Sequence, residues 1–138
     1  TPAGEALYFA ATFGARVNRI DLADGRRTAR KLGFQPDNLT WSDEGARIAA
    51  GHDGLPLLTT RGCRTIADAG CGFSFRVVRV APDLGAAAWL FRSDGRGIPG
   101  ASTALVDRET SWLGTAFGDR VTRVTSISPR GQTPRASH

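Results

Sequence analysis

Two neighbouring oxygen donors, Asp37 and Asn38, are the side chains of this sequence best suited to bind a metal ion. Calcium is a hard cation that takes about six to eight oxygen ligands, and a neutral amide dilutes the negative charge that a carboxylate brings. Two ligands alone do not hold the ion. Taken by themselves, Pro36, Asp37 and Asn38 are also typical of a turn that opens a strand, so both interpretations stay open on the residues alone.

His52 is the only histidine besides the terminal His138. An imidazole changes its charge near neutral pH, so it can bind or polarise a substrate and move a proton. An equally good interpretation is a histidine at a strand end that bonds to a carbonyl. His52 is therefore a candidate catalytic residue with a structural alternative.

The two cysteines, Cys63 and Cys71, lie in a stretch, 53–72, that is rich in glycine, threonine and leucine and has no clear period. We interpret this stretch as a long loop and favour a local disulfide over two free buried thiols. A disulfide indicates an oxidising compartment, so a periplasmic or secreted protein is expected, with the cytoplasm as the alternative. With two histidines in the whole chain, a zinc site is a poor interpretation of the pair.

The elements that position these residues are predicted to be short strands. The 138 residues are 41% hydrophobic, enough for one domain with a core, and 17 glycines and 7 prolines interrupt every helical run. The net charge is +5, but the arginines are scattered, which argues against a nucleic-acid-binding surface. The sequence has no apolar run of about 18 residues, so no membrane span is predicted.

The sequence repeats itself. Phe13–Ile20 and Phe117–Val124 share the pattern Phe-Gly-x-Arg-Val-x-Arg-Ile/Val, and a degenerate copy occurs at Phe75–Val80. Phe13 and Phe117 are 104 positions apart, which is two units of about 52 residues. That unit is near the length of one four-stranded propeller blade with an inserted loop. We therefore predict an all-β partial β-propeller of about two and a half four-stranded antiparallel blades.

Each full copy is predicted to be a hairpin that turns at Phe-Gly and continues in a strand alternating Arg or Asn with Val or Ile. A polar turn at 42–45 is predicted to join two further strands. The domain is expected over 1–128, with the loop inserted at 53–72 and a frayed tail at 129–138. The predicted strands are Leu7–Thr12 with Arg16–Asp21, Leu39–Trp41 with Arg47–Ala50, Ala86–Arg92, Thr103–Asp107, and Trp112–Ala116 with Arg120–Thr125.

The order of several short motifs resembles the carboxy-terminal half of the paraoxonase/arylesterase family, whose wider relatives are the gluconolactonase and strictosidine-synthase-like six-bladed β-propellers. The resemblance covers roughly residues 1–126, and its most specific part is Pro36–His52. The motifs, in chain order, are Leu7–Ala11, Pro36–Thr40, Ala50–His52, Ser102–Ala104 and Leu113–Phe117.

The resemblance implies a calcium ion in the central channel, with Asp37 and Asn38 among its ligands, His52 lining the channel, and Ser102 and Thr103 lining the substrate site. Small hydroxyls at a strand start are also common turn-bonding residues. The family's remaining ligands belong to earlier blades. We therefore expect part of a calcium-dependent esterase or lactonase, acting on a small-molecule ester or lactone and completed by a second copy or an amino-terminal half. The alternative is a non-catalytic binding or scaffold propeller.

Overall fold

The computed structural model describes residues 4–54 and 72–125, with the exception of Gly97, Pro99, Glu109 and Phe117. Most of the predicted loop at 53–72, with Cys63 and Cys71, lies outside the described residues, as does the predicted tail at 129–138. The predicted disulfide and the domain limits therefore stay predictions. Within the described residues, no helix has the length and apolar character needed to cross a membrane.

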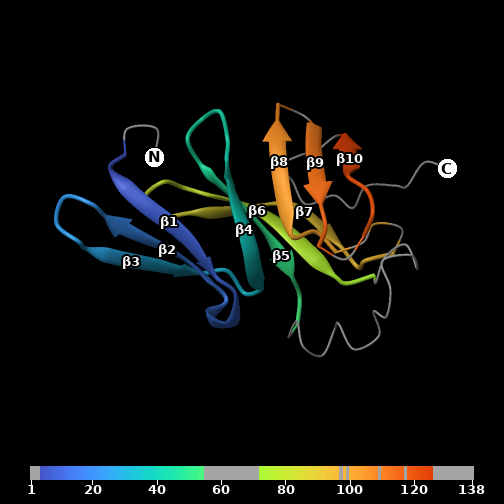
Figure 1. Ribbon diagram of the computed structural model, residues 1–138, viewed down its shortest axis with the longest axis horizontal. Coiled ribbons are helices and arrows are strands. Elements are labelled where there is room, and N and C mark those ends of the chain that lie inside the picture. Colours follow the sequence, from blue (N-terminus) through green and yellow to red (C-terminus); the bar gives the residue numbers. More distant parts are fainter. Residues whose placement is uncertain are drawn as a thin grey trace.

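The described residues form an all-β structure of three antiparallel sheets (Figure 1), which confirms the all-β part of the predicted fold. Sheet A has the order β1-β2-β3, sheet B the order β4-β5-β6-β7, and sheet C the order β10-β9-β8. The strands are β1 (Ala6–Ala11), β2 (Arg16–Asp21), β3 (Arg27–Lys31), β4 (Gln35–Trp41), β5 (Arg47–His52), β6 (Phe75–Val80), β7 (Ala87–Ser93), β8 (Thr103–Asp107), β9 (Thr110–Gly114) and β10 (Thr122–Thr125).

The predicted hairpins are present. β1 pairs with β2, β4 with β5, and β9 with β10, each antiparallel. The turn between β1 and β2 is a short 3-10 segment, Thr12–Gly14, and the residue with the left-handed backbone is Ala15, at φ 49°, rather than the glycine. The strand β3 was not predicted, because its sequence, Arg-Thr-Ala-Arg-Lys, has no apolar alternation.

Sheet B lies between sheets A and C, and each of its two faces carries a separate core. Successive strand residues point to opposite faces, so one face of β5 meets sheet A and the other meets sheet C. Ala49 belongs to the first core and Ile48 to the second, and both are fully buried. The first core also contains Val17, Leu32, Phe34, Val78, Val80 and Leu84; the second also contains Ala50, Phe75, Val77, Phe91, Ala101, Ala104, Val106 and Leu113.

The strands β4 and β8 lie side by side and run in the same direction. The backbone N–H of Asn38 donates to the carbonyl of Ser102, and two residues on, the hydroxyl of Thr40 donates to the carbonyl of Ala104. The strand β1 runs the opposite way, since Tyr8 near its start meets Trp41 at the end of β4 (Figure 1).

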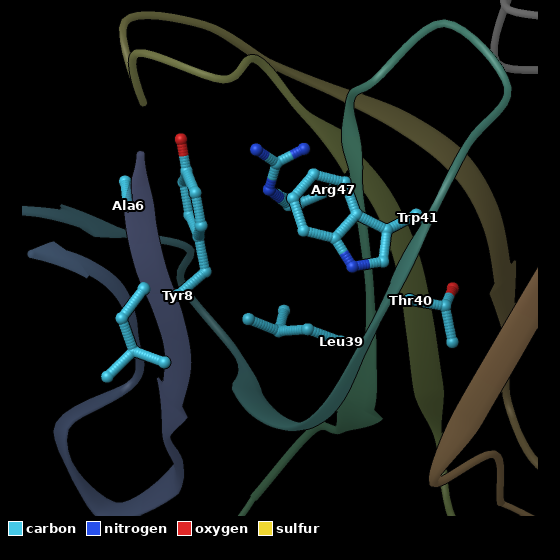
Figure 2. A pocket seen from close by; sticks show the side chains of 7 residues that line it. Ala6, Tyr8, Leu39, Thr40, Trp41 and Arg47 are labelled. Carbon is cyan, nitrogen blue, oxygen red and sulfur yellow. The ribbon is translucent and has the colours of Figure 1, made fainter. Parts of the chain in front are cut away.

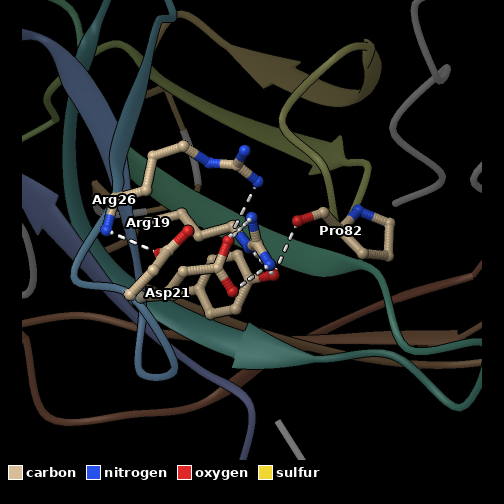
Figure 3. A network of polar contacts seen from close by, with 6 residues as sticks. Arg19, Asp21, Arg26 and Pro82 are labelled. Carbon is tan, nitrogen blue, oxygen red and sulfur yellow. Dashed lines mark hydrogen bonds and ion pairs between the residues drawn. The ribbon is translucent and has the colours of Figure 1, made fainter.

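Tyr8 belongs to a polar network that links sheet A to Pro82 after β6; Figure 3 labels Arg19, Asp21, Arg26 and Pro82 of this network. The Tyr8 hydroxyl donates to the carbonyl of Pro82 at 2.6 Å and accepts from Nε of Arg19 at 3.1 Å. Arg19 also forms an ion pair with Asp21 at 2.7 Å, and Arg26 approaches the same carboxylate at 3.4 Å. Because its hydroxyl both donates and accepts, the ring of Tyr8 has a fixed position.

Candidate functional site

The candidate site lies where β4 begins, opposite the end of β5. The pairing register shifts between Pro36 and Asn38, so Asp37 is the extra residue of a β-bulge. A bulge breaks the strict alternation of side chains and re-aims the residue that it inserts. The Pro-Asp-Asn segment is thus neither a separate turn nor a regular strand, but an irregular start of β4.

Gly51 makes this bulge possible. It pairs with Pro36, and a Cβ at its position would lie 1.9 Å from the carbonyl oxygen of Gln35 and 2.7 Å from Cα of Pro36. Both atoms belong to the backbone, so they do not swing aside as a side chain would. The close approach of β4 and β5 beside Asp37 therefore requires glycine.

Asn38 joins the start of β4 to the segment that leads into β8. Its Nδ2 donates to the carbonyl of Ser102 at 3.1 Å, and its backbone N–H donates to the same oxygen at 3.1 Å. These bonds use the amide nitrogen and leave the amide oxygen of Asn38 as an acceptor. Asp37 is half-buried, and no described residue forms a hydrogen bond or ion pair with its carboxylate.

His52 ends β5 and is 5% exposed. Its ring meets the ring of Phe73 edge to face at a centroid distance of 5.8 Å. A Cβ at Gly100 would lie 2.9 Å from its Nδ1, so the backbone before β8 passes close to the imidazole. Burial lowers the pKa of His52, and the nearby charge of Asp37 opposes that shift in part.

The two predicted substrate-lining residues have different surroundings. Ser102 is buried; its hydroxyl accepts from the backbone N–H of Ala116 at 3.2 Å, and its own N–H donates to the carbonyl of Gly114 at 2.9 Å. Thr103 is half-buried at the first position of β8, and its methyl group lies against Gly114. Ser102 thus has the bonding that its structural interpretation predicts.

The structure therefore brings four of the predicted residues, Asp37, Asn38, His52 and Ser102, to one end of β4, β5 and β8, with Thr103 next to them (Figure 1). Asp37 and Asn38 supply oxygen donors of the kind calcium takes. The described residues contain no group of three or more His, Cys, Asp or Glu side chains placed to hold a metal ion. The pair matches calcium in donor type, and the described residues do not complete a coordination sphere around it.

Sequence reasoning missed a second group of residues at the opposite end of β4. Arg47, Tyr8 and Trp41 line a pocket of about 210 Å³, together with Ala6, Leu7, Leu39 and Thr40 (Figure 2). Its sequence signal was weak, because an arginine at the first position of a strand is ordinary. Only the tertiary structure brings Tyr8, which is 39 positions from Arg47, against it.

Neither a protein-family model nor a curated protein matches this chain. The resemblance to the paraoxonase/arylesterase family therefore stays a prediction made from the motifs.

Proposed function

We propose that sheets A, B and C are successive blades of a partial β-propeller. Sheet B has the strand order of a complete four-stranded blade, β4-β5-β6-β7. Ten described strands in groups of three, four and three amount to two and a half such blades.

The positions of the internal repeat support this proposal. The three copies of the motif fall on β2, β6 and β10. The strands β6 and β10 are the third strands of sheets B and C, counted in chain order. β2 is the second strand of sheet A, so the repeat assigns β1 to the second position of a blade and leaves the first position beside β1 open.

Strand direction supports the same assignment independently of the motif. The first strands of sheets B and C, β4 and β8, run parallel to each other, as the innermost strands of successive blades do. β1 runs opposite to them, which is the direction of a second strand. On this proposal a second copy of the chain or an amino-terminal half fills the open position and completes the ring.

We further propose that the intact protein is a calcium-dependent esterase or lactonase. The observation that carries this proposal is the convergence of Asp37, Asn38, His52 and Ser102, from segments up to 65 positions apart, at one end of the strands that would line the channel. Asp37 and Asn38 would hold the ion, with other ligands from water, carbonyls or further blades. Bound calcium polarises an ester carbonyl and stabilises the negative charge that develops on its oxygen.

The surroundings of His52 suit such a site. Because burial lowers its pKa, the imidazole is neutral near neutral pH and adds no positive charge that would repel a cation held by Asp37. The hydrogen bonds of Asn38 to Ser102 orient its amide before any ion arrives.

Thermal unfolding in calcium tests the metal site. A ligand that binds only the folded state raises the melting temperature, by an amount that grows with the logarithm of its concentration once the site is saturated. We expect calcium to raise the melting temperature of the wild type and of the control Asn18→Ala, but not that of Asn38→Ala. A wild type whose melting temperature is unchanged in tens of millimolar calcium would contradict the proposal.

The second candidate function is a non-catalytic binding or scaffold module, and the outer faces of sheets A and C favour it. Leu7 and Phe9 of β1 are 54% and 42% exposed, and Leu105 and Trp112 of β8 and β9 are 52% and 42% exposed. Apolar side chains gathered on an outer sheet face are typical of surfaces that another protein segment covers. If calcium leaves the protein unchanged, this function becomes the better account.

A further inference from the structure

Arg47 is a buried cation that two aromatic rings support. The side chain belongs to the first residue of β5 and only 2% of the residue is exposed. Its guanidinium carbon lies 3.8 Å from the ring centroid of Tyr8 and 3.5 Å from that of Trp41 (Figure 2). The two rings meet edge to face, at 76°, so the guanidinium sits in the corner between them. Such contacts attract the charge but do not neutralise it.

The hydrogen-bonding capacity of Arg47 is largely unused. One terminal nitrogen donates to the carbonyl of Gly45, and Nε is buried without a partner. No described carboxylate forms an ion pair with it. A guanidinium has five N–H donors, and a buried charge without a counterion is costly, so this arrangement calls for an anion.

A pocket adjoins the guanidinium. About 210 Å³ of space lies between β1 and β4, and Arg47 contributes to its wall. Tyr8, Trp41 and Leu39 contribute two aromatic rings and one aliphatic side chain to the remaining wall. Tyr8 is held in place by its bond to Pro82, so the wall exists before a ligand enters.

We propose that this pocket binds the carboxylate of a small apolar acid. The guanidinium presents paired N–H groups in one plane, which matches the planar geometry of a carboxylate. The aromatic and aliphatic walls would contact the apolar part of the same molecule. A phosphate group suits the pocket less well, because a single arginine among the lining residues offers too few donors for its oxygens.

This site is separate from the one at Asp37 and Asn38. Trp41 and Arg47 pair with each other at the end of β4 and the start of β5, whereas Asp37 lies at the start of β4. The proposal therefore does not depend on the calcium site, and each can fail without the other.

Tryptophan fluorescence tests the proposal, since Trp41 touches the guanidinium directly. In a Trp89→Phe, Trp112→Phe background, Trp41 is the only indole that remains. We expect cyclohexanecarboxylate, which is transparent at the wavelengths used, to change the Trp41 emission with saturation. Cyclohexanecarboxamide, its neutral counterpart, and inorganic phosphate are expected to bind at least tenfold more weakly.

Substitutions at position 47 complete the test. Arg47→Lys keeps the charge but loses the paired, coplanar N–H groups of the guanidinium, so at least tenfold weaker carboxylate binding is expected. Arg47→Met is expected to abolish carboxylate binding. Arg123→Met, at an exposed position of β10, is the control and should bind as the parent does. If Arg47→Met does not fold, the comparison of carboxylate with carboxamide on the parent decides. Equal binding of the two compounds, equal binding of phosphate, or wild-type binding by Arg47→Met would overturn the proposal.

Discussion

The two ends of β5 carry buried basic side chains in different surroundings. Arg47, at the start of the strand, has its guanidinium against two aromatic rings. His52, at the end, lies against Phe73, and burial favours its neutral form. The same strand therefore supplies a cation to one site and a neutral imidazole to the other.

The lowered pKa of His52 predicts how stability depends on pH. The unfolded histidine titrates near its ordinary value of about 6.5. Between that value and the lower folded pKa, the unfolded state binds more protons, so the free energy of unfolding falls as the pH is lowered through this range. We expect denaturant titrations to show that the free energy of unfolding falls less between pH 7 and pH 5 in His52→Gln than in the wild type. An equal fall in the two proteins would show that His52 is not the group responsible.

Residue type and order in the sequence selected the candidate site residues but did not predict their surroundings. Asp37, Asn38 and His52 were selected by type and order, and the structure brings them together. The burial of His52 depends on Phe73 and Gly100, which are distant in the chain, so no local pattern predicts it. The cation–π contact between Arg47 and the ring of Tyr8 was missed for the same reason.

At the scale of the elements, the hairpins were predictable from the sequence and the edge strand β3 was not. β1, β2 and β6 contain the aromatic and β-branched residues that favour strands. β3 has no such pattern and is held by its partners: it pairs with β2, and Arg30 donates to the carbonyls of Leu84 and Gly85 at 3.0 and 2.8 Å. Tertiary contacts here override local preference.

The bulge in β4 requires a glycine at position 51 of β5. In Gly51→Ala the new methyl group would collide with backbone atoms of Gln35 and Pro36, so we expect a loss of about 3 kcal/mol or more in the free energy of unfolding. The control Gly14→Ala meets only the flexible side chain of Arg16 within 3.4 Å and should change that energy by less than about 0.5 kcal/mol.

Urea titrations of both alanine variants measure the difference. A Gly51→Ala variant as stable as Gly14→Ala would mean that β4 and β5 are not as close at the bulge as the structure has them.

For the whole molecule, the internal repeat carried the most information in the sequence. The spacing of about 52 residues predicted a β-repeat architecture, and the motif copies fall on β2, β6 and β10 of three separate sheets. The sequence did not show which sheets lie side by side. That arrangement comes from two cores, one on each face of sheet B, whose members are spread from Val17 to Leu113.

On our proposal, the start of β4, the end of β5 and the segment before β8 form one calcium site. Backbone amide NMR during a calcium titration tests this proposal, with Asp37→Asn as the matched variant. We predict saturable shifts confined to residues 35–38, 51–52 and 100–103, and their loss in Asp37→Asn. An unchanged spectrum, or shifts centred on exposed carboxylates such as Asp24 and Asp119, would contradict the claim.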